Sequence, residues 1–371
     1  MSNMLNQNQI SSANIMVVGC GALGNEVLKN LVLMGVTHIT VVDFDIVETG
    51  NLSRSILFTK ADAEQRRLKI DVVAERLKQL NPDIDMTTIC GDIAYNVGLG
   101  LIKQMDVIIG CVDSRWARFC INRLAMRAGK PWVDGGIDGL EGTARVFMPG
   151  KNCYACNLGP EGLKDLARRM PCSGIIRRQE QAGSAPTTSI VASVIGAIQV
   201  QEALKLIQPE FGTSLCGRMF YYEGQHMEVH TAQYEAYDDD CAEHECWHPI
   251  SHTKADVDTC VQQALHIWEQ ELGADEVELC LANDCFVDYV SRRDNDERTM
   301  VMCPGHKVEE MVEHNNTLCG LSSAALYQNE YKHITAAFPY PDLTLQQLGI
   351  PSNDVVHVVA NGKDYYLALS K

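Results

Sequence analysis

The 371-residue sequence lacks the features that would place it in a membrane or outside the cell. Its first residues show no basic stretch followed by an apolar core, so we expect no signal peptide. No run of about 18 or more apolar residues occurs, which predicts that no segment spans a bilayer. An excess of basic residues is also missing, because 48 acidic residues outweigh 31 basic ones. We therefore expect neither nucleic acid nor a membrane as a partner.

Cysteine, in contrast, is plentiful, with 15 residues. In a chain without a signal peptide, thiols belong in a reducing compartment, where they bind metal, act in catalysis or fill the core. A cytoplasmic location is therefore expected. The composition is otherwise that of a globular protein, with 46% hydrophobic residues, and the length suits two domains.

Strands and helices alternate along the first half of the chain. Short β-branched runs such as Ile15–Val18 and His38–Val42 predict strands, and helical spacing over Arg67–Leu80 predicts a helix. Such alternation predicts an α/β fold with a doubly wound, mainly parallel, Rossmann-like sheet. Further strands are expected at 85–89, 106–111, 131–133, 218–222 and 226–231, and further helices at 26–34, 118–128 and 188–207.

The composition changes at Tyr237, where acidic residues, histidines and cysteines crowd together. We place a boundary near position 250, which gives one domain over 1–250 and a small C-terminal α+β module over 254–371. The closing part of this module, from Leu343 to Val359, resembles that of β-grasp folds. Three of its cysteines, Cys280, Cys285 and Cys303, are expected to fill the core, with a decayed zinc ribbon as the alternative.

A glycine-rich loop follows the first predicted strand. Gly19, Gly21 and Gly24 would let the backbone approach a phosphate at the N-terminus of a helix. Asp43, at the end of the second strand, suits a ribose hydroxyl. On these residues alone, a nicotinamide oxidoreductase and an enzyme that binds a nucleoside triphosphate both remain open.

The residues that follow distinguish a nicotinamide oxidoreductase from an enzyme that binds a nucleoside triphosphate. The run Asp43-Phe-Asp-Ile-Val-Glu-Thr-Gly-Asn-Leu-Ser-Arg54 precedes Lys69 in a predicted helix, and later come Asp113, Arg118 and Asn122. This series closely resembles the pattern of the ThiF/MoeB and ubiquitin-activating superfamily, D-x-D-x-V-x-x-x-N-L-x-R, then lysine, then D-x-x-x-x-R-x-x-x-N. The resemblance covers about residues 12–250. A nicotinamide enzyme has no need of such residues around a triphosphate.

The resemblance implies an adenylation domain that uses ATP and Mg²⁺ to activate the C-terminal glycine of a ubiquitin-like protein. Arg54 and Lys69 would bind the phosphates and Asp113 would hold Mg²⁺, so these three residues would be catalytic. The whole nucleotide site that it implies comprises Gly19, Gly21, Gly24, Asp43, Asp45, Asn51, Arg54, Lys69, Asp92 and Asp113, with Asp92 beside the base.

One part of the family pattern is missing. Family members commonly carry an N-terminal arm of R-Y-x-R-Q type, whose arginine enters the ATP site of the partner subunit. In this sequence no Arg or Lys precedes Lys29. The resemblance implies a homodimer, and the source of an arginine that would complete its ATP site stays open.

Two pairs of cysteines have spacings that suit a metal ion. Cys153-Tyr-Ala-Cys156 can seat two thiolates on one metal, although a redox pair has the same spacing. Cys241 and Cys246 form the second pair. This unequal arrangement resembles that of members similar to the ubiquitin-fold-modifier-activating enzyme, which implies a structural zinc ion. The alternative ligands are His244 and His248.

Thioester-forming relatives place their catalytic cysteine shortly before a Pro-Thr-Thr sequence, and here that position is Gln181. The cysteine between Cys156 and Pro186 is Cys172, and arginines on both sides of it would favour its thiolate form. We therefore expect adenylation, then a thioester on Cys172, then transfer to a conjugating enzyme. The alternative is an adenylyltransferase that activates a sulfur-carrier protein without an enzyme thioester.

Overall fold

The computed structural model describes residues 6–159, 161–162, 166, 187–233, 237–281, 284–292, 297–315 and 326–370. These residues form two compact units. Unit 1 holds the described residues of 6–94, 102–159 and 187–246, and unit 2 holds those of 95–101, 161–166 and 247–370. The predicted nucleophile Cys172 and the neighbouring position Gln181 lie outside the described residues.

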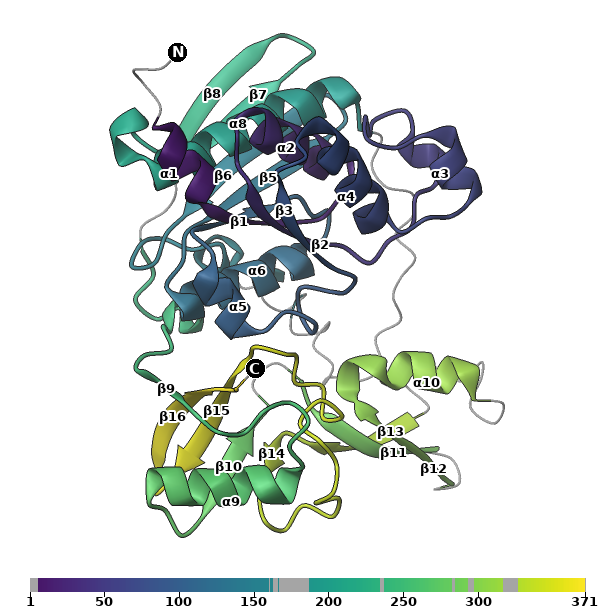
Figure 1. Ribbon diagram of the computed structural model, residues 1–371, viewed down its shortest axis with the longest axis vertical. Coiled ribbons are helices and arrows are strands. Elements are labelled where there is room, and N and C mark those ends of the chain that lie inside the picture. Colours follow the sequence, from purple (N-terminus) through teal and green to yellow (C-terminus); the bar gives the residue numbers. More distant parts are fainter. Residues whose placement is uncertain are drawn as a thin grey trace. The chain divides into compact units, whose positions relative to one another are not determined.

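Unit 1 is built on an eight-stranded sheet in the order β3-β2-β1-β4-β5-β6-β7-β8 (Figure 1). Pairing is parallel from β3 to β5 and antiparallel from β5 to β8. The predicted α/β fold with a doubly wound, mainly parallel sheet is therefore confirmed. The strands are β1 (Asn14–Val18), β2 (His38–Val42), β3 (Asp85–Ile89), β4 (Val107–Gly110), β5 (Trp132–Asp138), β6 (Glu141–Phe147), β7 (Arg218–Glu223) and β8 (Glu228–Gln233).

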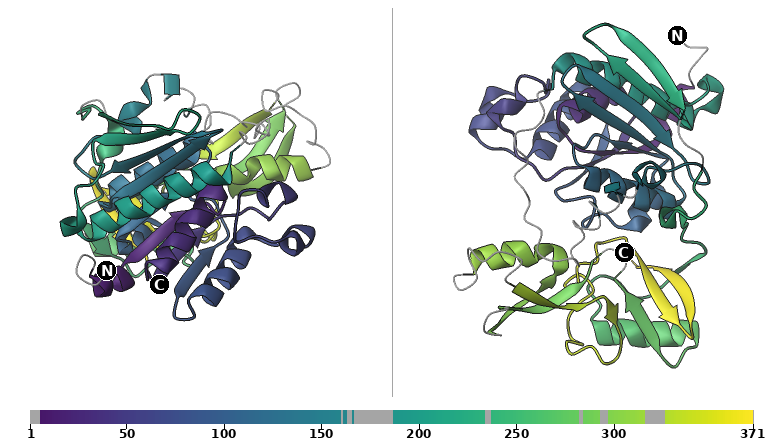
Figure 2. Two further views of the ribbon diagram at one scale, coloured as in Figure 1. Left: turned by 90° about the horizontal axis from the view of Figure 1, so that it is seen from above. Right: turned by 180° about the vertical axis from the view of Figure 1, so that it is seen from behind.

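Helices pack on both faces of this sheet. On one face, α2 (Ala22–Leu33), α4 (Lys69–Leu80) and α8 (Ser189–Ile207) share a hydrophobic core with β1 and β2, and Figure 2 shows α8 running beside α2. On the other face, α6 (Arg115–Ala128) packs Ile121 over Gly110 of β4. The shorter helices of the N-terminal half are α1 (Gln7–Ser12), α3 (Lys60–Glu64) and α5 (Leu99–Gln104).

Helix α8 has 19 residues and is long and apolar enough to cross a membrane by length and composition. Half of its apolar stretch is buried, and Ala192, Ile195 and Ala203 are fully buried in unit 1. A Cβ at Gly196 would lie 2.9 Å from the Cβ of Glu26, so α8 and α2 approach each other closely. These contacts are those of a helix packed into a protein core.

Unit 2 contains two smaller sheets. A five-stranded sheet, in the order β14-β10-β15-β16-β9, packs against α9 (Val261–Leu272), which buries Trp268. A three-stranded sheet, in the order β12-β11-β13, packs with α10 (Val308–His314). The strands are β9 (Ile250–His252), β10 (Val277–Cys280), β11 (Phe286–Arg292), β12 (Arg298–Pro304), β13 (Leu326–Tyr331), β14 (His333–Ile334), β15 (Val355–Ala360) and β16 (Lys363–Ala368).

The three cysteines of unit 2 that were predicted to fill the core differ in their surroundings. Cys285 and Cys303 are buried and fill the core beneath α10, as predicted. Cys280 is only half-buried and lies at the end of β10, so the prediction that it fills the core is wrong.

Candidate functional site

Three of the residues predicted to bind a nucleotide lie at or near the carboxyl ends of parallel strands. Gly19 follows β1, Asp43 follows β2, and Asp113 comes shortly after β4. Strand β1 lies between β2 and β4, and the order of the strands reverses at this point. In open α/β sheets, ligands bind in the crevice at such a reversal. The fold therefore brings three predicted segments to one edge of the sheet.

The glycine loop keeps its shape through backbone contacts that leave no room for side chains. Gly19 has a φ of 98°, and a Cβ there would lie 2.5 Å from the carbonyl oxygen of Cys111. A Cβ at Gly24 would lie 2.0 Å from the carbonyl oxygen of Gly19. A Cβ at Gly21, however, would meet nothing within 4 Å. Packing thus requires Gly19 and Gly24, whereas the space beside Gly21 can admit a ligand.

Helix α2 begins directly after this loop, at Ala22 rather than at the predicted Glu26. Its N-cap is Gly21, which has no side chain to bind the N–H groups of the first turn. Backbone N–H groups at the start of a helix and the positive end of the helix dipole favour a phosphate group at such a position. The loop and the start of α2 together form a candidate phosphate site.

Asp43, Asp45 and Lys69 form a hydrogen-bonded group beside the loop. The two carboxylate oxygens of Asp43 accept from the N–H groups of Cys20 and Asp45, at 2.6 and 2.7 Å. The Nζ of Lys69 donates to Oδ2 of Asp45 at 2.8 Å. Burial alone would lower the pKa of Lys69, but Asp43 and Asp45 raise the pKa above its ordinary value. Lys69, only 7% exposed, is therefore a buried ammonium group held by carboxylates.

The other predicted nucleotide residues are more exposed. Asn51 accepts the N–H of Glu48 at 3.0 Å and so fixes the start of the 3₁₀ helix η1 (Thr49–Asn51), and Arg54 follows half-buried. Asp92 is also half-buried. Asp113 is exposed just before α6, and a carboxylate in that position can bind a hard cation such as Mg²⁺.

Asn25 connects the glycine loop to the segment that carries Arg54. Its amide nitrogen donates to the carbonyl oxygens of Cys20 and Gly21, and its oxygen accepts the N–H of Leu57 at 2.9 Å. This residue was not among those predicted from the sequence. The available signal was an amide side chain on the otherwise apolar face of a helix, where a buried polar group needs partners.

Arg118, which matches the family pattern, belongs to a buried ion cluster with Asp134 and Arg145. Nε of Arg118 donates to Asp134 at 2.9 Å, and Nε of Arg145 donates to the other carboxylate oxygen at 3.0 Å. Burial would raise the pKa of Asp134, but the two guanidinium groups outweigh it and lower the pKa. The cluster joins α6 to β5 and β6, where Asp134 and Arg145 are directly paired.

Asn122 ends the family pattern and links α6 to the predicted metal site. Its side-chain oxygen accepts from Nε1 of Trp132 at 3.3 Å and from the N–H of Tyr154 at 3.0 Å. Tyr154 lies between Cys153 and Cys156. The hydrogen bond therefore holds the turn that presents these two thiols.

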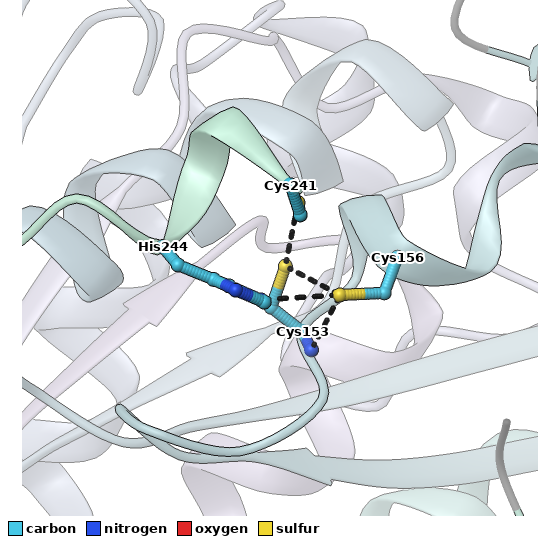
Figure 3. Close-up of side chains that lie close together, drawn as sticks. All are labelled: Cys153, Cys156, Cys241 and His244. Carbon is cyan, nitrogen blue, oxygen red and sulfur yellow. Dashed lines mark hydrogen bonds between the residues drawn. The ribbon is translucent and has the colours of Figure 1, made fainter. Parts of the chain in front are cut away.

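Cys153, Cys156, Cys241 and His244 point toward one another (Figure 3). The Sγ atom of Cys153 lies 3.6 Å from that of Cys156 and 3.9 Å from that of Cys241. Nε2 of His244 lies 3.1 Å from Sγ of Cys156, and all four ligand atoms lie within 4.8 Å of one another. Tetrahedral zinc with Zn–S bonds of about 2.3 Å holds its sulfur atoms about 3.8 Å apart. The spacing of the sulfur atoms therefore suits zinc with three thiolate ligands and one imidazole ligand.

Cys246, which was predicted as the fourth ligand, lies outside this cluster. Its exposed Sγ contacts the carbonyl oxygen of Arg127 at 3.6 Å. The physical reason is the 3₁₀ helix η5 (Ala242–His244) that follows Cys241. With three residues per turn, it brings the third residue after Cys241, which is His244, back to the same side. Glu245 is extended, so the chain then leaves the cluster.

Contacts on the outer side of the cluster hold η5 in place. Arg123 of α6 donates two hydrogen bonds of 2.8 Å to the carboxylate of Glu243. The ring of His244 stacks on Tyr237, with centroids 4.1 Å apart. Nδ1 of His244 is buried and has no hydrogen-bond partner among the described residues. The imidazole is thus oriented by packing, with Nε2 directed at the thiols.

Comparisons with known proteins agree with the motif. The ThiF family profile matches residues 2–243. The chain is 31% identical over 229 residues to the probable adenylyltransferase/sulfurtransferase MoeZ of Mycobacterium tuberculosis. The aligned region covers 61% of this chain and 55% of MoeZ. It is 29% identical over 228 residues to the SAMP-activating enzyme E1 of Haloferax volcanii, covering 62% of this chain and 79% of that protein. The chain thus spans about half the length of MoeZ.

A solved structure supports the fold. The crystal structure of E. coli MccB with succinimide matches with a TM-score of 0.53 at 21% identity, covering 65% of this chain and 68% of MccB. At this identity the likeness concerns the fold. Because the family profile spans more than half of the sequence, the chain belongs to the ThiF family.

Proposed function

We propose that this chain uses ATP to adenylate the C-terminal glycine of a small ubiquitin-like or sulfur-carrier protein. The observation that carries the proposal is the buried ammonium group of Lys69, held by Asp45 next to the glycine loop. Relatives support the reaction by name, one as the SAMP-activating enzyme E1 and another, from Thermus thermophilus, as a sulfur carrier protein adenylyltransferase.

In this reaction a carboxylate oxygen of the carrier protein attacks the α-phosphorus of ATP. The bond to pyrophosphate breaks, and an acyl-adenylate forms. Negative charge grows on the departing pyrophosphate, so cationic groups near the phosphates accelerate the step. Lys69 and Arg54 would supply this charge, and Asp113 would hold Mg²⁺. No nucleophile from the enzyme is needed.

The remaining residues would orient the nucleotide. The phosphates would pass beside Gly21, where the backbone leaves room, and meet the N-terminus of α2. Each carboxylate oxygen of Asp43 accepts one backbone N–H and keeps a lone pair for a ribose hydroxyl. Asp92 would lie beside the base. The zinc ion would be structural, because four protein ligands leave no open position for catalysis.

Pyrophosphate exchange into ATP tests the proposal. Exchange should require a carrier protein with a free C-terminal glycine, and Lys69→Ala and Asp113→Ala should each lower the rate on the order of 100-fold or more. Lys60→Ala is the matched control, because Lys60 is exposed and pairs only with Glu64 among the contacts of the described chain. Unchanged exchange in both Lys69→Ala and Asp113→Ala would reject the assignment.

The step after adenylation divides the proposal into two versions. In the first, Cys172 attacks the acyl-adenylate, AMP leaves, and the resulting thioester passes to a conjugating enzyme, with a homodimer as the active assembly. In the second, a sulfur-carrier protein is released as its adenylate. The name adenylyltransferase/sulfurtransferase of MoeZ favours the second version.

A non-reducing gel distinguishes the versions. In the first, wild type and Cys90→Ser form an adduct with the carrier protein that dithiothreitol cleaves, whereas Cys172→Ala forms none and keeps its pyrophosphate exchange. Cys90 is an exposed thiol and serves as the control. An adduct that persists in Cys172→Ala points to another thiol, and the absence of any adduct in wild type selects the second version.

A further inference from the structure

Strands β10 and β14 place three side chains that can bind metal on one face of the five-stranded sheet of unit 2. Cys280 of β10 pairs directly with His333 of β14. Alternation along β10 puts Glu278 on the same face as Cys280. Sγ of Cys280 lies 3.7 Å from Nδ1 of His333 and 3.8 Å from Oε1 of Glu278. His333 and Glu278 are also hydrogen-bonded, and the three ligand atoms lie within 4.8 Å of one another.

We propose that Glu278, Cys280 and His333 bind a divalent transition-metal ion, such as Zn²⁺ or Co²⁺. This site is separate from the cluster of Cys153 and its partners in unit 1. It does not depend on the proposed adenylation reaction.

The backbone fixes the spacing of these three ligands. Leu279, between Glu278 and Cys280, points to the opposite face of the sheet and pairs with Ile334, the neighbour of His333. Leu279 and Ile334 are both buried in the core that includes α9. Because this packed face holds β10 and β14 in register, the ligand atoms on the outer face are positioned before an ion arrives.

The donor set determines the kind of ion. One thiolate, one imidazole and one carboxylate form a set of intermediate softness that suits zinc and cobalt better than Mg²⁺ or Ca²⁺. Three protein ligands leave a fourth position for water. The side chains of His333 and Glu278 are 63% and 37% exposed, so an ion can enter from solvent.

Neighbouring charges favour a cation at this position. The carboxylate of Glu278 lies 3.8 Å from Sγ of Cys280 and carries a negative charge that a bound cation would offset. On the other side of β10, His357 of β15 pairs with Cys280, and its Nε2 contacts Oδ1 of Asp364 at 2.7 Å. This second acidic group adds to the negative potential of the face.

Cobalt titration of the full-length chain, prepared with one zinc ion per chain for the cluster of unit 1 and with all further zinc removed by a chelator, tests the proposal. Wild type should bind about one Co²⁺ more than Cys280→Ser and show thiolate-to-cobalt absorption that Cys280→Ser lacks. Glu278→Gln and His333→Ala should weaken Co²⁺ binding by at least the roughly 10–100-fold that the loss of an outer partner of a metal ligand costs. Cobalt that replaces zinc in the other cluster would appear equally in all variants, so difference spectra isolate the new site.

Two control variants complete the design. His266→Ala removes a histidine that is 68% exposed on α9, and Cys90→Ser removes an exposed thiol. Both should bind Co²⁺ as wild type does, with unchanged circular dichroism. If Cys280→Ser does not fold, the Glu278→Gln and His333→Ala variants test the proposal. Both side chains are partly exposed, so their replacement should leave the fold intact. Titrations that match wild type in these two variants would overturn the proposal.

Discussion

The imidazole of His244, and not the thiol of Cys246, lies beside the three thiols of the candidate zinc cluster. His244→Ala should lose zinc and melt at a lower temperature, because a structural zinc site contributes directly to folding free energy. His244→Cys should keep the zinc, since a thiolate can replace the imidazole. Cys246→Ser should also keep it, because the thiol of Cys246 contacts the carbonyl oxygen of Arg127 instead. Zinc content and melting temperature, measured on the three variants, check this.

The opposite result has a clear meaning. If Cys246→Ser lost zinc while His244→Ala kept it, the fourth ligand would be the one predicted from the C-x-x-x-x-C spacing. Cys246 was predicted because the spacing of the two cysteine pairs resembles that of modifier-activating relatives. Such a spacing contains no information on the turn between Cys241 and Cys246. The 3₁₀ geometry of η5 brings the third residue after Cys241 back toward the thiols of the cluster.

At the scale of elements, Asp134 of β5 links three elements, because it binds Arg118 of α6 and Arg145 of β6. Asp134→Asn should destabilise the protein by about 3–5 kcal/mol, because Arg118 and Arg145 would keep their charges without a counter-ion. Asp138→Asn, at the exposed end of the same strand, is the matched control and should change little. Denaturant unfolding at neutral pH measures both. Equal stability in Asp134→Asn and wild type would show that the cluster is not a structural anchor.

The carboxylate of Asp134 should also make the stability of the protein depend on pH. The pKa of Asp134 is lower in the folded protein than the unfolded value of about 3.9. Its contribution to stability is therefore complete above that unfolded pKa and disappears as the pH falls from there through the lower, folded pKa. In this acidic range the stability of wild type should fall more steeply than that of Asp134→Asn, as measured by unfolding at a series of pH values.

Elements defined by local pattern were predicted well. Strands β2 and β3 begin and end at the predicted residues, because each is a short run bounded by turn residues. The start of α2 was placed too late, since Gly24 was interpreted as part of a turn. The structure shows that it is a helical residue that must lack a Cβ, next to the carbonyl of Gly19. The antiparallel strand β6 was missed.

At the scale of the whole molecule, the two candidate sites differ in how much the sequence revealed. The nucleotide residues follow predicted strands in a fixed order, so the fold brings Gly19, Asp43 and Asp113 to one edge of the sheet. The cluster on unit 2 depends instead on the pairing of Cys280 with His333, which are 53 positions apart. Strand pairing over that distance depends on tertiary structure, so a local sequence pattern cannot predict it.

The candidate zinc cluster also has a consequence for chain topology. Cys153 and Cys241 are 88 positions apart, so one bound ion would close a ring that contains α8, β7, β8 and the sequence around Cys172. A cross-link of this span reduces the entropy of the unfolded chain by an amount worth about 4–5 kcal/mol. A disulfide would give a similar constraint permanently, whereas a chelator can open this ring. The conformational entropy that the chain loses on folding would then depend on the supply of metal.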